Sequence, residues 1–428
     1  MAQAVTDKKL VERKKESSVF KEWRFVLLFA TTAVSSFSVS FFMISTNWYV
    51  VNYLGLEAML GFVMFASSVP RLIFMLLGGV IADRMSKPWI MFISDFTKGI
   101  LLVGVLGLFT FDVLSIWVLI GLALMFGILD AFFYPASNSL LPSTVKPEQL
   151  TRANSVISMT NHSSQIVGPL LAGVLLTTGG YGLVFGVTAA ALLLAGLIDI
   201  ILKRSVSKAA ADKMNEEPAV AAGKRLSVVA SMKEGLAYVK NKSFLLALMA
   251  STVFLNLFFT GPLMVGLPLY ATTVLSGSAV TYSFLNGGIS AGMLVGTLII
   301  GVLNIQKKRG LISVIGILFL AMAFLFFSLS AAFWLSMVMI ILIGMAVGII
   351  NVPLAAVIQK HTDKEYLGRV MSLVSFSSMG LVPVSYLMTS LLLGLHVSVS
   401  AIMTVSAACL MVVSLVIMMK AKALRTVD

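Results

Sequence analysis

Two stretches of this 428-residue sequence match at five positions: residues 148–158 read EQLTRANSVIS and residues 365–375 read EYLGRVMSLVS. The shared Glu, Leu, Arg and two Ser residues are all separated by the same 217 positions. An apolar run with a proline precedes each copy, with Pro135 before the first and Pro353 before the second. Two copies in the same orientation, half a chain apart, predict a parallel internal repeat.

The composition excludes a water-soluble fold. Hydrophobic residues make up 59% of the chain and charged residues 11%, against roughly a quarter charged in soluble domains. The apolar runs repeatedly exceed the roughly 20 residues that a helix needs to cross a bilayer. They are continuous and rich in Leu, Met and Ala, which favours helices over strands. We expect spans near 24–50, 56–82, 89–110, 113–141, 152–177, 181–203, 243–272, 277–304, 310–329, 332–358, 369–394 and 397–419.

Basic residues are distributed unevenly among the gaps. Of the 31 Lys and Arg residues, only Arg71 and Lys98 lie inside apolar runs, and the others lie at the chain ends or in every second gap. The remaining gaps carry only Glu57 and Asp112 as charges. By the positive-inside rule, we expect both termini in the cytoplasm of a multi-pass membrane protein. The net charge of +13 thus reflects topology and contact with anionic lipid, not nucleic-acid binding.

The twelve spans divide into two groups of six, which predicts an all-α membrane protein of two pseudo-symmetric six-helix bundles. We place the bundles at 23–203 and 243–419, with cytoplasmic segments at 1–22, 204–242 and 420–428. The middle segment carries an apolar stripe at helical spacing, formed by Leu226, Val229, Met232, Leu236 and Val239. This stripe predicts an amphipathic helix on the membrane surface. We favour the interpretation that this middle segment is only a tether over the alternative that it is a regulatory element.

The gap after the second span reads GGVIADRMSK over residues 78–87. Its paired glycines, its Asp-Arg pair and the basic residue after them resemble the cytoplasmic loop signature of the major facilitator superfamily. The resemblance implies that Asp83 faces the positive N-terminal end of the eleventh span, near Arg369, and that this contact closes the cytoplasmic side. A purely topological role for Arg84 and Lys87 is the alternative. The candidate gating residues are Gly79, Asp83, Arg84, Lys87, Arg152 and Arg369.

Further motifs narrow the resemblance. Pro-Arg at 70–71, Ser-Asp at 94–95, DAFFYPA at 130–136 and Gly168-Pro169 are similar to the drug:proton antiporter subgroup that contains macrolide-efflux proteins and enterobactin exporters. The resemblance implies an exporter in a bacterial plasma membrane that works by alternating access and proton antiport. The chain departs from the antiporter pattern in its fourth span, which lacks the arginine of many such transporters. Gly168 and Pro169 keep only the end of the antiporter motif.

Charges inside the apolar runs are candidates for proton coupling, because each costs about 2.5 kcal/mol or more unless it is paired or hydrated. Arg71 and Asp130 each lie eleven residues, or about 16 Å, from the cytoplasmic ends of their spans, which predicts an ion pair between them. The pair either only neutralises two charges or responds to protonation of Asp130. Asp95 and Lys98 share one helix face, and a structural pair is favoured over a coupling role. For His162, a hydrogen-bonded core position is favoured over a proton carrier.

The resemblance also implies a central cavity lined by the first, fourth, seventh and tenth spans. Candidate lining residues are Phe37, Phe41, Asn47, Phe133, Tyr134, Asn256, Phe259, Met345 and Asn351. An apolar, adaptable cavity with few polar anchors suits bulky lipophilic molecules better than sugars or phosphorylated metabolites.

We therefore expect an exporter of bulky amphiphilic compounds such as drugs or macrolide-like molecules, coupled to protons, acting as a monomer and needing no cofactor or metal. The sequence has no G-x-x-x-x-G-K-[ST] signature for ATP. A siderophore or lipid exporter and an uncoupled facilitator are the alternatives. An intramembrane enzyme is the remote alternative, because the spans lack a paired His-Glu metal motif and a catalytic dyad at helical spacing.

Overall fold

The computed structural model describes residues 18–213, 234, 236–303, 308–363 and 366–420. These residues are nearly all helical, and the described part contains no strand. Eleven of its helices are long and apolar enough to cross a membrane. The longest, Pro147–Ser207, breaks at Gly180, whose φ of 65° is one that glycine adopts without strain. It therefore supplies two crossings, and the predicted all-α fold with twelve crossings is confirmed.

The first bundle holds six crossings, and the elements that form them are α2 (Trp23–Trp48), α3 (Leu60–Arg84), α4 (Lys87–Thr110), α5 (Ile116–Leu140) and α6 (Leu150–Lys213). The π-helical segment η2 (Tyr49–Tyr53) extends α2. In this bundle α6 packs against α2 and α4, while α3 packs against α5. Because α3 continues to Arg84, Asp83 and Arg84 lie in its last turn, and the prediction of a loop that contains them is wrong.

The second bundle is built from α8 (Ser243–Leu255), α9 (Gly261–Leu269), α10 (Ala279–Leu303), α11 (Arg309–Leu329), α12 (Phe333–His361), α13 (Leu367–Gly380), α14 (Val382–Gly394) and α15 (Val399–Lys420). The π-helical segment η6 (Asn256–Thr260) joins α8 and α9 into one crossing, and η7 (Tyr270–Val274) extends it. Helices α13 and α14 together form another crossing. The internal repeat is visible in detail. The first and seventh crossings both end in a π-helical segment, and Pro135 and Pro353 both lie inside helices.

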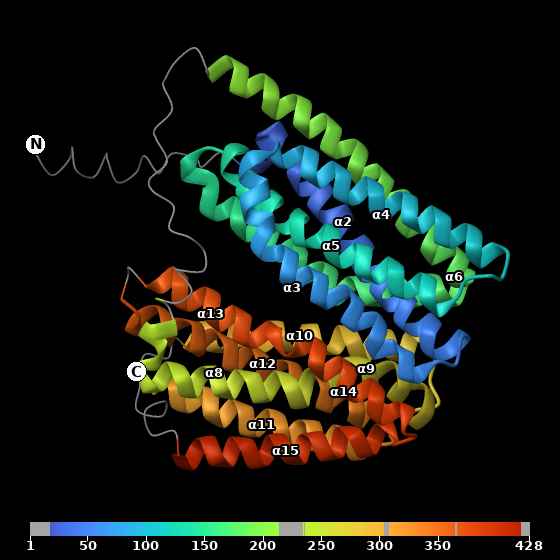
Figure 1. Ribbon diagram of the computed structural model, residues 1–428, viewed down its shortest axis with the longest axis vertical. Coiled ribbons are helices and arrows are strands. Elements are labelled where there is room, and N and C mark those ends of the chain that lie inside the picture. Colours follow the sequence, from blue (N-terminus) through green and yellow to red (C-terminus); the bar gives the residue numbers. More distant parts are fainter. Residues whose placement is uncertain (1–17, 214–233, 235, 304–307, 364–365, 421–428) are drawn as a thin grey trace, which may run out of the picture.

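The two bundles touch through α3 with α14 and through α6 with α10. We call the end of the molecule that carries Lys87, Lys203 and Lys242 the basic end, and the end that carries Asp112 and Gly180 the opposite end. Figure 1 shows the bundles close together at the opposite end and diverging toward the basic end. A large buried apolar cluster with members from both bundles lies at the opposite end.

Large apolar side chains also cover the outer surface. Trp334 is 78% exposed and Trp117 is 71% exposed. Such a surface suits a bilayer and not water. The predicted amphipathic helix lies mostly outside the described residues. Residues 236–240, which belong to its described part, are helical.

Candidate functional site

A cavity of about 660 Å³ lies between the two bundles. Residues of α2, α3, α5 and α6 form one side, and residues of α9, α10, α13 and α14 form the other. Met, Phe and Tyr side chains supply much of the wall, while Asn161, Gln165 and Asn286 supply amides. Arg71 and Asp130 are the charged residues among those that line it. The cavity therefore combines adaptable apolar surface with a few polar groups, which suits a small amphiphilic molecule.

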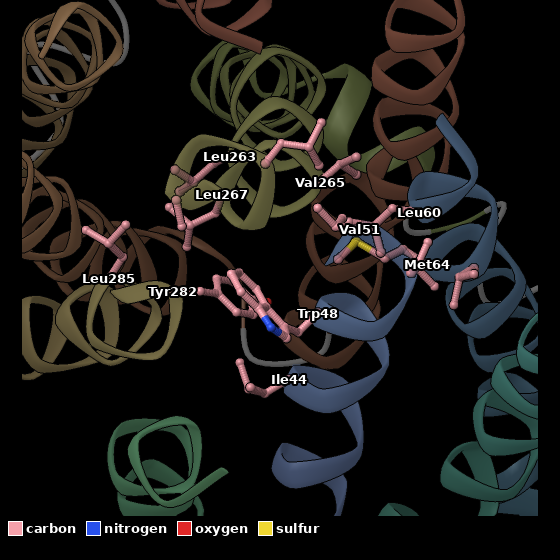
Figure 2. Packing of buried hydrophobic residues seen from close by; sticks show 14 of the residues in the cluster. Ile44, Trp48, Val51, Leu60, Met64, Leu263, Val265, Leu267, Tyr282 and Leu285 are labelled. Carbon is pink, nitrogen blue, oxygen red and sulfur yellow. The ribbon is translucent and has the colours of Figure 1, made fainter. Parts of the chain in front are cut away.

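The cavity is closed at the opposite end by contacts between the bundles. The rings of Trp48 and Tyr282 stack with centroids 5.9 Å apart and an interplanar angle of 12°, and Figure 2 shows them side by side. Asn47 Nδ2 donates to the Tyr282 hydroxyl oxygen at 3.1 Å. The backbone N–H of Gly61 donates to Ser390 Oγ at 2.8 Å. These contacts join α2 to α10 and α3 to α14.

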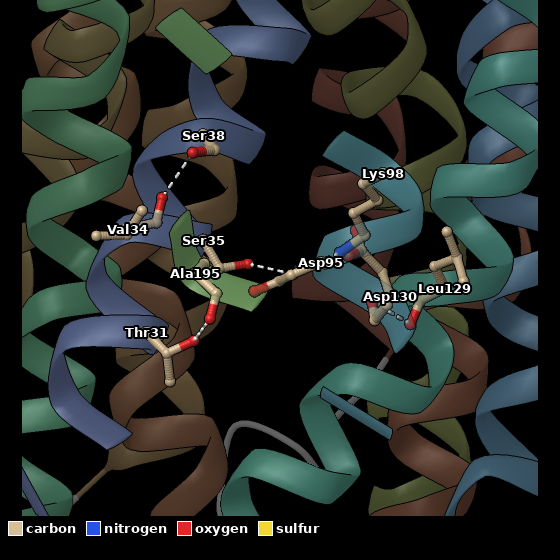
Figure 3. A network of polar contacts seen from close by, with 10 residues as sticks. Thr31, Val34, Ser35, Ser38, Asp95, Lys98, Leu129, Asp130 and Ala195 are labelled. Atoms are coloured by element: carbon tan, nitrogen blue, oxygen red, sulfur yellow. Dashed lines mark hydrogen bonds and ion pairs between the residues drawn. The ribbon is translucent and has the colours of Figure 1, made fainter. Parts of the chain in front are cut away.

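A buried polar network connects the cavity wall to the interior of the first bundle (Figure 3). Lys98 Nζ donates to Asp130 Oδ1 at 2.5 Å and lies 3.5 Å from Asp95 Oδ1. Ser35 Oγ donates to the same Asp95 oxygen at 2.9 Å. Lys98 and Asp95 are both 0% exposed. The network therefore links α2, α4 and α5 through charges that reach the cavity only at Asp130.

The predicted ion pair between Arg71 and Asp130 is wrong. Asp130 pairs with Lys98 instead, and Arg71 Cζ lies 5.0 Å from the centroid of the Tyr134 ring. Arg71 has no carboxylate within ion-pair distance among the described residues. The predicted depth of Asp130 in the membrane is compatible with either Arg71 or Lys98 as its partner. The ammonium of Lys98 reaches Asp130 from α4, which packs beside α5.

One further acid, Asp199, is buried, although its place about one turn from Lys203 in the sequence favours a position at the membrane interface. Asp199 of α6 is 0% exposed, and neither of its carboxylate oxygens has a hydrogen-bond partner among the described residues. The neighbouring Thr31 hydroxyl donates to the carbonyl oxygen of Ala195 at 3.4 Å. By contrast, His162 is exposed, so the prediction of a core histidine is wrong.

Two of the nine predicted lining residues, Asn47 and Tyr134, lie in the cavity wall. Phe41, Phe133 and Phe259 are buried in the core. Outside the wall of this cavity also lie Phe37, Asn256, Met345 and Asn351. No residue of α12 lines the cavity, and α3, α10 and α14 contribute instead. The resemblance had named the helices but could not say which face of each helix turns inward.

The amides that sequence reasoning missed had a recognisable signal. Asn161 and Gln165 are four residues apart, so they share one face of α6. Pro169 follows on the same helix and also lines the cavity. At Gly168, an added Cβ would overlap the hydroxyl of Ser40, so glycine permits the close approach of α6 to α2.

The predicted gating residues occupy several environments. Lys87 Nζ donates to the carbonyl oxygen of Ser139 at 2.8 Å and so ties α4 to the end of α5. Arg369 pairs with Glu234 at 3.0 Å. Arg152 is exposed. At Gly79, Asp83 and Arg84 the structure describes only the backbone of α3, so the contact of Asp83 with the start of α13 stays a prediction.

Comparison with known proteins agrees with this architecture. The chain is 24% identical over 379 residues to macrolide efflux protein A of Streptococcus pyogenes, covering 87% of this chain and 90% of that protein. It is 25% identical over 303 residues to enterobactin exporter EntS of Escherichia coli O1:K1 / APEC, covering 70% and 68%. A bacterial homologue of the iron transporter ferroportin in an inward-facing state matches with a TM-score of 0.68 at 16% identity, covering 95% and 100%. Residues 28–386 match the family profile, and the chain belongs to the Major Facilitator Superfamily.

Proposed function

We propose that this chain is a secondary active exporter of bulky amphiphilic small molecules, driven by inward proton flow in an antiport cycle. The cavity supports this function, because Met and aromatic side chains can adapt to a lipophilic body while a few polar groups orient it. An efflux protein and a siderophore exporter among the relatives also support export. Superfamily transporters move solutes and are not enzymes, so an intramembrane enzyme is not proposed.

The position of Asp130 is the observation that supports proton coupling. Its side chain lines the cavity, while Oδ1 binds the buried ammonium of Lys98. A proton delivered through the cavity would neutralise Asp130 and weaken this bond, leaving Lys98 with Asp95 alone. Because the bond joins α5 to α4, its loss changes the relative stability of the bundle's conformations. Rocking of the two bundles then exposes the cavity at alternate ends.

The basic residues support an orientation in which the basic end and both termini lie in the cytoplasm of a bacterial cell. The cavity is closed at the opposite end by Trp48 and Tyr282. The conformation described here is therefore the one that takes up substrate from inside. Each chain carries a complete cavity between its own two bundles, so the proposed working unit is a monomer.

The test is efflux of a lipophilic dye or macrolide from proteoliposomes under an imposed pH gradient, with wild type and Asp130→Asn compared. Asp112→Asn is the matched control, because Asp112 is an exposed carboxylate that bonds to Tyr53 at the opposite end. We expect gradient-driven flux in wild type and Asp112→Asn, and its loss in Asp130→Asn with unpowered exchange retained. Equal driven flux in all three would mean that Asp130 only neutralises Lys98. Exchange that ignores the gradient even in wild type would indicate an uncoupled facilitator.

A further inference from the structure

Arg71 is the charge in the cavity that the proposed cycle does not use. It lies in α3 directly after Pro70 and lines the cavity. The guanidinium lies over the Tyr134 ring, with Cζ 5.0 Å from the ring centroid. A ring attracts the charge but supplies no oxygen acceptor for the five N–H donors of the guanidinium. Among the described residues, no carboxylate lies within ion-pair distance of Arg71.

The charged residues around the cavity differ in whether another protein charge already neutralises them. Asp130 is bound by Lys98 at 2.5 Å, so its charge is already compensated. Asp95 is 0% exposed behind it and also contacts Lys98. Among the described residues, Arg71 is thus the cavity-lining charge that has no counter-ion.

We propose that Arg71 anchors an oxyanion, such as a carboxylate or an ionised phenol, on the amphiphilic substrate. This inference rests on the proposed export function and narrows its substrate class to anionic amphiphiles. A guanidinium binds an oxyanion through two parallel hydrogen bonds, which orients it as well as attracting it. The side chains of Met64, Met264, Met293 and Tyr386 line the same cavity and can hold the apolar body. A cationic amphiphile would instead meet an uncompensated positive charge.

The anchor also has a consequence for coupling. Because the substrate would leave as an anion while protons enter, both steps of the exchange would move positive charge inward. Outward movement of an anion is further assisted by a membrane potential that is negative inside.

The test compares three pyrene probes with similar apolar bodies: 1-pyrenebutyrate, its methyl ester and 1-pyrenemethylamine. Binding to the purified chain at pH 7.5 is measured by energy transfer from tryptophan, without any gradient. Wild type is expected to bind the acid about tenfold or more tightly than the ester. Arg71→Gln should remove this preference by weakening the acid alone, and Arg71→Lys should retain part of it.

Lys203→Gln is the matched control, because Lys203 also lies over an aromatic ring, Trp89, with Nζ 4.1 Å from the centroid, but does not line the cavity. It should keep the wild-type preference. An unchanged acid-to-ester ratio in Arg71→Gln would overturn the inference, as would a wild type that binds the amine more tightly than the acid. If Arg71→Gln does not fold, this wild-type comparison and Arg71→Lys decide the question. If wild type shows no preference for the acid, the export proposal still stands. If wild type shows no gradient-driven flux, proton-driven export is overturned and the binding result still stands.

Discussion

The buried ammonium of Lys98 neutralises two carboxylates inside the first bundle. It lies within 4 Å of the carboxylates of both Asp95 and Asp130, and it is fully buried. Removing one partner of a buried ion pair leaves an uncompensated charge and costs about 3–5 kcal/mol. Asp199 differs from Lys98 in this respect. Its buried carboxylate has no hydrogen-bond partner among the described residues, so its removal breaks no such bond.

We predict that Lys98→Met lowers the free energy of unfolding by about 3 kcal/mol or more, because two carboxylates lose their cation. Asp199→Leu, which removes an unpartnered carboxylate from the interior, should leave stability unchanged or raise it. Thermal unfolding in detergent at neutral pH measures both. A wild-type melting temperature for Lys98→Met, or an equal fall for Asp199→Leu, would contradict this account of the network.

At the scale of elements, glycines set how closely the bundles approach at the opposite end. A Cβ at Gly61 would overlap the Ser390 hydroxyl and the Tyr386 carbonyl oxygen of α14. A Cβ at Gly173 of α6 would overlap the Ser283 hydroxyl of α10. Both contacts join the two bundles, so in the proposed cycle they break when the opposite end opens. Side chains at these positions would therefore act on one conformation selectively.

We predict that Gly61→Val destabilises the closed opposite end by about 1–3 kcal/mol and shifts the population toward the outward-open form. The measurement is labelling of Asn286→Cys, a cavity position, by an impermeant maleimide from outside, in a Cys409→Ser background. Gly104→Val is the control, because a Cβ at Gly104 meets no atom within 4 Å. Labelling of Gly61→Val at the rate of the control would refute the closing role.

For the whole molecule, the twelve crossings and their repeat were predictable, because span length and charge placement act locally along the chain. The site was only partly predictable. Spacing gives the depth of Arg71 and Asp130 in the membrane, but the partner of each depends on how its helix is rotated about its axis. Helices that are apolar all round, as buried membrane helices are, give little sign of that rotation. Lys98 therefore forms the ion pair with Asp130 that was predicted for Arg71. Residues of α10 and α14, not of the predicted α12, line the cavity.

In the proposed cycle, protons and substrate are obligatorily exchanged across the membrane through this cavity. The most direct test starts with substrate-loaded proteoliposomes at equal pH on both sides and follows the internal pH on dilution. Because coupling is reciprocal, a substrate gradient alone must drive protons in the opposite direction in wild type and not in Asp130→Asn. Substrate loss without any proton movement in wild type would contradict the antiport mechanism.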